Sequence, residues 1–167
     1  MSNINNKLEE LSASILINND MLKVPVDVLK LARLNNIKVY QGDLNLDKKI
    51  SGVIRYDKAI KAFEILVNKN DPPVRQRFTI AHELGHFFLH KDILENEKIH
   101  IDTMYRMPED KEKEVDYFAG ALLMNKILLE KMYEKNTSIT QLAEIFKVSV
   151  SAMTVRLDIL GLLWAKD

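Results

Sequence analysis

The chain has 167 residues, of which 47% are hydrophobic and 29% are charged. This composition argues against intrinsic disorder and fits one domain, or one domain with a small appendage. Its 24 basic side chains balance its 24 acidic ones, whereas nucleic-acid-binding proteins usually carry a basic excess. The absence of cysteine excludes disulfide bonds, thiolate metal ligands and cysteine nucleophiles.

The N-terminal residues and the hydropathy of the chain predict where the protein works. Residues 1–19 contain Glu9 and Glu10 and lack a basic start followed by an apolar run, so they do not resemble a signal peptide. The longest apolar stretches fall far short of a membrane span. We therefore expect a soluble, cytoplasmic protein without a membrane partner.

The first half of the chain predicts two helices followed by short strands. Apolar residues recur with helical spacing over residues 4–17, which predicts an amphipathic helix. Pro25 suits the first position of a second helix, which ends near Asn36. A hairpin turn is predicted at 57–59. Apolar alternation predicts strands at 37–40, 50–56 and 62–67.

The second half is predicted to be helical. The double proline at 72–73 belongs to a loop, and a helix is expected from Val74 to about His90. Residues 91–108 show few periodic signals and predict a long connection. Further helices are expected over 108–124, 126–134, 138–146 and 151–160. Short strands followed by helices indicate an α+β fold.

The strongest chemical signal is the segment His82-Glu83-Leu84-Gly85-His86 on the helix at 74–90. Residues that are four positions apart lie on one face of a helix, so both imidazoles can bind one metal ion while Glu83 reaches a water on that ion. The flanking residues are uncharged, so the helix is expected to be buried. A buried carboxylate is costly without a partner, and a metal-bound water would supply one.

A third ligand is expected from the following helix, because catalytic zinc usually has three protein ligands and one open position. Glu112 and Asp116 are four positions apart and share a face. Glu112 is the predicted ligand, and Asp116 is predicted to accept a hydrogen bond from a ligand histidine and so fix its tautomer. Glu114 is the second choice, and His90 and His100 are further alternatives.

Several segments along most of the chain resemble the ImmA/IrrE metallopeptidases of mobile genetic elements and stress regulation. The most specific are Arg75-Gln76-Arg77-Phe78-Thr79-Ile80-Ala81-His82-Glu83-Leu84-Gly85-His86 and Glu112-x-Glu114-Val115-Asp116-x-Phe118-Ala119 with Leu122-Leu123-Met124. The segments 24–27, 37–39, 51–54 and 65–68 also match. The chain departs from the family where Val115-Asp116 replaces a frequent Ala-Asn and where Asn125 replaces a proline; Asp116 still suits its predicted role.

The resemblance implies that His82, His86 and Glu112 bind Zn²⁺ and that Glu83 is the catalytic base. It also implies a minimal zincin-like fold, in which a small three-stranded sheet packs on the helix of the two histidines and on a second, glutamate-bearing helix. Family members cleave a partner repressor and thereby derepress the element. We expect a site-specific endopeptidase whose protein substrate is a helix-turn-helix repressor encoded nearby.

Two parts of the reaction are less constrained by the sequence. An extended substrate is expected to add to a sheet edge, and the segment Ala62–Val67 is the predicted strand. The oxyanion needs a second stabilising group. Nothing in the sequence ranks the candidates, which are Tyr105, Tyr117, His90 and His100.

The C-terminal segment 139–157 resembles a helix-turn-helix. Lys147 stands where the turn often has glycine, and Arg156 is the only cation on the second helix. Because DNA recognition needs cations at phosphates, we expect a packing or substrate-docking unit, and DNA binding is not favoured. The predicted domains are a metallopeptidase domain at 1–135 and this subdomain at 136–167.

Two other functions compete with the repressor-cleaving peptidase. One is a non-catalytic regulator that binds DNA or a partner and has a structural or vestigial metal site. The other is a general scavenging peptidase, which would degrade unstructured substrates. Cleavage that depends on Glu83, together with an open metal position, would distinguish the peptidase from the non-catalytic regulator.

Overall fold

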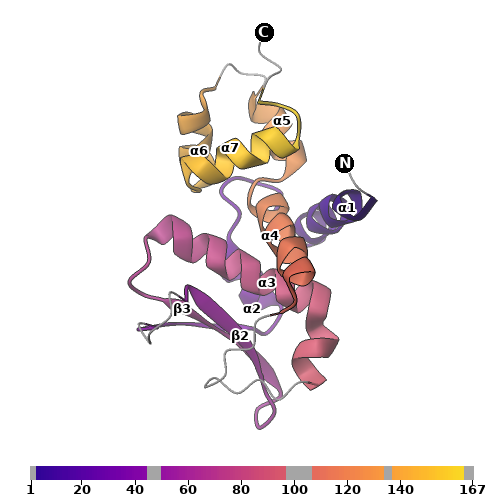
Figure 1. The fold of residues 1–167 in the computed structure, drawn as a ribbon, viewed down its shortest axis with the longest axis vertical. Coiled ribbons are helices and arrows are strands. Elements are labelled where there is room, and N and C mark those ends of the chain that lie inside the picture. Colours follow the sequence, from indigo (N-terminus) through magenta and orange to yellow (C-terminus); the bar gives the residue numbers. More distant parts are fainter. Residues whose placement is uncertain (1–2, 45–49, 97–106, 134–136, 164–167) are drawn as a thin grey trace. The chain divides into compact units, whose positions relative to one another are not determined.

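The computed structural model describes residues 3–44, 50–96, 107–133 and 137–163 (Figure 1). The chain divides into two compact units. The sheet unit is Asp27–Asp116, and the helical unit combines Met1–Val26 with Tyr117–Asp167. The predicted division at residues 135 and 136 falls within a segment outside the described residues and stays a prediction. No described helix has the length and apolar character needed to cross a membrane.

The sheet unit confirms the predicted α+β class with its three-stranded sheet. In the order β1-β3-β2, β3 pairs in parallel with β1 and antiparallel with β2. The elements are α2 (Val28–Leu34), β1 (Lys38–Gly42), β2 (Gly52–Asp57), β3 (Ala62–Asn68), α3 (Pro73–Asn96) and the first part of α4 (Glu109–Leu123).

The central position of β3 corrects the predicted substrate edge. Residues 62–67 lie in β3, whose backbone is paired on both sides, so this strand cannot add an extended substrate and the prediction was wrong. The edges of the described sheet are β1 and β2. Apolar alternation predicted the strand itself, but it does not distinguish a central strand from an edge strand.

One face of the sheet packs on α3, and the other carries polar side chains. The buried side chains of Ile54, Phe63 and Ile65 lie on the first face, and α3 contacts both β2 and β3. On the opposite face, Arg55 Nη2 lies 2.6 Å from Glu64 Oε2. The alternation along β2 and β3 therefore fixes which side of the sheet receives α3.

Two helices in the sheet unit differ from their predicted bounds. Asp27 accepts a hydrogen bond from Lys30 N at 2.8 Å, so α2 begins after this cap and not at Pro25. α3 continues beyond His90 to Asn96 and is kinked at His90 (φ −132°, ψ 24°). The predicted connection is therefore wrong for residues 91–96, where buried Leu94 anchors the extra helix.

The helical unit contains the predicted helices of both ends of the chain. The capping box of Ser138 and Gln141 starts α6, and Ser149 caps α7. Lys147 has a φ of 53° in the turn between these two helices, a left-handed conformation that glycine adopts more readily. The elements are α1 (Asn3–Asn18), the end of α4, α5 (Lys126–Tyr133), α6 (Ile139–Phe146) and α7 (Val150–Ile159).

Arg156 is buried at the centre of the helical unit. Its Nη1 and Nη2 lie 2.6 and 2.8 Å from the two carboxylate oxygens of Glu9 on α1, and its Nε donates to Met124 O at 3.0 Å. Tyr117 also donates to Glu9, at 2.8 Å. The only cation of α7 is therefore committed to an internal ion pair, so this helix has no cationic side chain for a phosphate.

Candidate metal centre

His82 and His86 converge because they occupy consecutive turns of α3. Their Nε2 atoms are 3.1 Å apart. Ala81 and Leu84 are fully buried and fix the rotation of the helix about its axis. The two histidines thus turn toward one point, as the spacing predicted. His86 is buried, and the side chain of His82 is 18% exposed.

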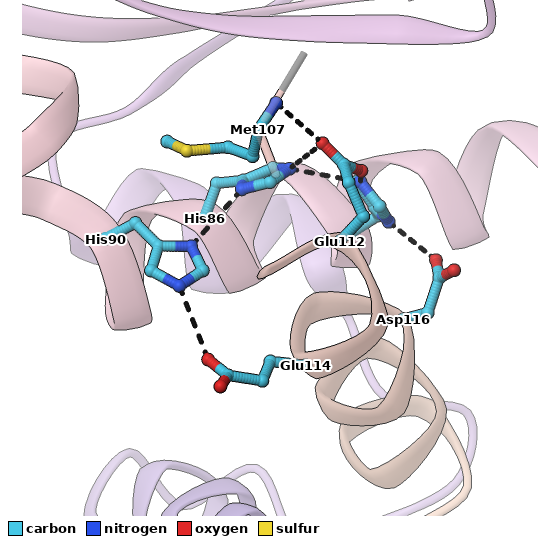
Figure 2. Close-up of polar contacts among 7 residues, drawn as sticks. His86, His90, Met107, Glu112, Glu114 and Asp116 are labelled. Carbon is cyan, nitrogen blue, oxygen red and sulfur yellow. Dashed lines mark hydrogen bonds and ion pairs between the residues drawn. The ribbon is translucent and has the colours of Figure 1, made fainter. Parts of the chain in front are cut away.

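Glu112 reaches the same point from the first turn of α4. Its Oε2 lies 3.3 Å from His82 Nε2 and its Oε1 lies 3.8 Å from His86 Nε2. The backbone N–H of Met107 donates to Glu112 Oε1 at 3.1 Å (Figure 2). Sequence analysis missed this donor, because a backbone amide carries no residue-type signal and its position depends on the path of the chain.

The three side chains fit a divalent metal ion. Ligand atoms of His82, His86 and Glu112 all lie within 4.8 Å of one another. For bonds of about 2.1 Å in a tetrahedral site, neighbouring ligand atoms are about 3.4 Å apart. The two Nε2 atoms are 3.1 Å apart, and each lies 3.3 or 3.8 Å from a different oxygen of Glu112, so the separations are near this value. Two imidazoles and one carboxylate form the donor set of many catalytic zinc sites.

Asp116 contacts Nδ1 of His82, the ring nitrogen that is not directed at the other two ligands. Its Oδ1 lies 2.9 Å from His82 Nδ1. Burial lowers the pKa of His82, but the hydrogen bond with Asp116 and the charges of Glu83, Asp116 and Glu112 outweigh burial and raise it. Because the carboxylate accepts a hydrogen bond from Nδ1–H, the Nε2 lone pair of His82 stays available. It is directed at the position where the ligand atoms of His82, His86 and Glu112 converge, called here the metal point.

Glu83 is a buried carboxylate beside β2, with a residue exposure of 6%. Burial raises the pKa of Glu83 to about 7, although the charge of His82 and a hydrogen bond from the Ile54 backbone oppose the shift. Because Gly52 on β2 has no side chain, the Thr79 and Glu83 side chains of α3 can lie close to the backbone of this strand. A Cβ atom there would lie 2.3 Å from Thr79 Cγ2 and 3.6 Å from Glu83 Oε1.

His90 and Glu114, two of the alternative ligands, contact each other instead of the metal point. His90 Nδ1 lies 3.4 Å from His86 Nδ1, and His90 Nε2 lies 3.6 Å from Glu114 Oε2 (Figure 2). Burial and the charge of Lys111 lower the pKa of His90. Burial, followed by the neighbouring His82 and His90, lowers the pKa of His86 to about 3.

The remaining candidates are placed as follows. Tyr117 donates its hydroxyl hydrogen to Glu9 Oε1 at 2.8 Å. Tyr105 and His100 lie outside the described residues. Among the described residues, one group of ligand-type side chains converges closely enough to hold a metal ion, and it consists of His82, His86 and Glu112. The geometry therefore favours Glu112 over Glu114 as a partner of the two histidines.

Comparisons with known proteins place the chain in a family. Residues 38–158 match the family model of the IrrE N-terminal-like domain, peptidase family M78. The metallopeptidase ImmA of Bacillus subtilis (strain 168) is 30% identical over 138 residues, which make up 81% of this chain and 77% of ImmA.

A solved structure supports the fold. It is a Mycobacterium tuberculosis transcriptional regulator, to which the chain aligns with a TM-score of 0.66 and 21% identity. The match covers 92% of this chain, which spans about half, 48%, of that regulator. The family model and the ImmA relative show that the chain belongs to the IrrE N-terminal-like family, as the resemblance predicted. They also confirm the predicted class of enzyme, a metallopeptidase.

Proposed function

We propose that the protein is a zinc-dependent endopeptidase in which His82, His86 and Glu112 hold the metal and Glu83 is the general base. The observation that carries this proposal is the convergence of three ligand atoms within 4.8 Å, beside a buried carboxylate. Members of the family are peptidases, which supports a peptide bond as the target.

The proposed reaction is hydrolysis. A bound zinc ion would lower the pKa of a water molecule to about 7 and polarise the scissile carbonyl. Glu83 accepts a proton as the water oxygen adds to the carbonyl carbon, and it returns the proton to the nitrogen as the C–N bond breaks. Without metal, burial raises the pKa of Glu83 to about 7, and a bound cation would lower it toward the ionised form that a general base needs.

The outer edge of β2 is the proposed site for the substrate backbone. Asn68 N donates to Ser51 O at 2.8 Å, so the alternation of an antiparallel ladder turns the backbone groups of Gly52 and Ile54 away from β3. This edge also lies beside Glu83, because Ile54 donates a backbone hydrogen bond to that carboxylate. An extended peptide would pair with the remaining outward backbone groups of Gly52 and Ile54, which would bring its scissile carbonyl near Glu83 and the converging ligand atoms.

We infer from the resemblance to ImmA and IrrE that the substrate is a helix-turn-helix repressor encoded nearby. Cleavage would derepress the genes of a mobile element in the cytoplasm. The internal ion pair of Arg156 with Glu9 supports a packing or docking role for the C-terminal helices, because it leaves α7 without a free cation for DNA.

The test is co-expression with the repressor encoded beside the gene, followed by mass spectrometry of the repressor. Wild type should cut it at one position, and Glu83→Gln should slow cleavage by about 10²–10⁴-fold while keeping its zinc. Glu95→Gln is the matched control, since Glu95 also lies on α3 and its ion pair among the described residues is the exposed one with Lys91.

Each alternative function predicts a different outcome of this test. An intact repressor with zinc-loaded wild type would favour the non-catalytic regulator over the enzyme. Degradation of casein as fast as of the repressor would favour a scavenging peptidase.

A further inference from the structure

The two histidines of the metal centre have different partners at their outer nitrogens. His82 Nδ1 faces the carboxylate of Asp116 at 2.9 Å. His86 Nδ1 faces another imidazole, His90, at 3.4 Å, and His90 in turn faces Glu114 at 3.6 Å (Figure 2). The sequence analysis named Glu114 as an alternative ligand and His90 as an alternative ligand or oxyanion group, and the proposed function uses neither residue.

Donor and acceptor counts restrict the tautomers of this chain of contacts. A neutral imidazole has one N–H and one lone pair. If His86 Nε2 is to bind a metal, its hydrogen must be on Nδ1, and His90 Nδ1 must accept it. His90 must then carry its own hydrogen on Nε2. The opposite tautomer of His90 would donate to His86 Nδ1 and move the hydrogen of His86 to the nitrogen that faces the metal point.

Glu114 favours the required tautomer of His90. Its Oε2 is 3.6 Å from His90 Nε2, and its negative charge attracts a hydrogen on that nitrogen. Lys111 Nζ lies 3.4 Å from the same oxygen and helps to hold the carboxylate in place. His90 is buried, with 5% residue exposure, so water does not readily replace these partners.

We propose that Glu114 and His90 form a positioning relay that keeps His86 in its metal-binding tautomer. The proposal rests on the proposed function, because it takes His86 as a ligand. His90 is a positioning residue that acts through His86, and Asp116 does the same for His82 by a direct carboxylate contact. The proposed relay to His86 has one more member than the Asp116–His82 contact, because the imidazole of His90 lies between the ligand His86 and the carboxylate of Glu114.

The experiment compares two substitutions at position 90 of the full chain. His90→Phe keeps a ring but removes the acceptor, whereas His90→Asn places an amide oxygen near the position of Nδ1. Zinc affinity is measured by competition with a chelator. His90→Phe should bind zinc about 10- to 100-fold more weakly than wild type, the range for lost outer-shell partners, and His90→Asn should restore most of this loss. The visible spectrum of bound Co²⁺ should differ from that of wild type more in His90→Phe than in His90→Asn.

Controls separate this effect from a general loss of structure. Far-UV circular dichroism and thermal unfolding of the metal-free proteins check folding. Lys113→Ala on α4 should leave zinc affinity unchanged, because Lys113 is exposed and its ion pair within the described parts of the chain is with exposed Glu109. If His90→Phe does not fold, Glu114→Ala decides the question, and the relay predicts weaker zinc binding for it as well.

Different outcomes overturn the relay and the proposed function. A folded His90→Phe that binds zinc as tightly as wild type would overturn the relay while leaving His86 as a ligand. So would unchanged affinity in Glu114→Ala. A wild-type protein that binds no zinc, or that binds it equally well after His82→Ala, would overturn the proposed function and the relay with it.

Discussion

Glu112 in the sheet unit and Glu9 in the helical unit are carboxylates with similar exposure but opposite surroundings. Their side chains are 17% and 12% exposed. Glu9 receives both terminal nitrogens of Arg156 and the hydroxyl of Tyr117. Glu112 faces two imidazoles and one backbone N–H.

This contrast distinguishes a structural ion-pair cluster from a ligand site. A carboxylate paired with a guanidinium has its charge compensated within the protein. Glu112 has no such cation among its described contacts, and the lone pairs of His82 and His86 point to the same place. Converging acceptors with uncompensated charge favour an external cation.

The largest expected effect comes from removing a ligand. Glu112→Ala should weaken zinc binding by more than the roughly 100-fold that outer-shell changes reach, and it should abolish cleavage. Zinc per chain after dialysis against a chelator measures this. Glu109→Ala is the control, because Glu109 lies in the same turn and is 83% exposed. Full zinc retention in Glu112→Ala would remove this residue from the site.

Removing the cationic partner of Glu9 in the helical unit should lower the stability of the protein without changing its zinc affinity. Arg156→Met removes the buried guanidinium and leaves the part-buried Glu9 without its cation, which should lower the free energy of unfolding by about 3 kcal/mol. Urea denaturation measures the loss, and zinc affinity of the folded fraction should stay at the wild-type value. The double change Arg156→Met with Glu9→Leu should recover most of the stability. A loss below about 1 kcal/mol in the single variant would mean that the ion pair is not structural.

Local periodicity accounts for the parts of both units that the sequence predicted. The capping residues Ser138 and Ser149 mark where α6 and α7 begin, and the spacing of His82 and His86 requires only one regular helix. These signals lie within a few residues of one another. They do not depend on how the chain folds back on itself.

The features that the sequence missed depend on contacts between distant segments or on backbone groups, which carry no residue-type signal. The central position of β3 comes from its parallel pairing with β1, which alternation within either strand does not encode. The donors Met107 N–H and Ile54 N–H are backbone groups. The contact of Glu114 with His90 depends on the rotation of α4 beside α3, which spacing within α4 does not determine.

A smaller effect is expected at the exposed side of the metal centre. Asp116→Asn should weaken zinc binding by about 10-fold, the low end of the range for outer-shell partners, because the Asp116 side chain is 60% exposed and water can partly replace it. Chelator competition measures the change. A loss as large as that of Glu112→Ala would instead indicate that Asp116 binds the metal directly.

An effect of similar size is expected in the helical unit, as a loss of stability at alkaline pH. Burial and the neighbouring Glu9 raise the pKa of Tyr117 from 10 to about 12. The folded protein therefore holds this proton more tightly than the unfolded chain. The resulting stability is complete below pH 10 and is lost as the pH rises toward 12.

Tyr117→Phe isolates this contribution. It should cost about 1.5 kcal/mol near neutral pH, since the hydroxyl donates to a charged acceptor, and the cost relative to wild type should shrink between pH 10 and 12. Urea denaturation at several pH values measures both. A cost that stays constant up to pH 12 would contradict the raised pKa.

The most direct test of the central claim is a structure of the zinc-loaded protein, or its zinc X-ray absorption spectrum combined with ligand variants. We predict one zinc ion per chain, bound by His82 Nε2, His86 Nε2 and a Glu112 oxygen at about 2.0–2.2 Å, with water in a fourth position. Zinc bound at other side chains, or enclosed by four protein ligands, would contradict the account.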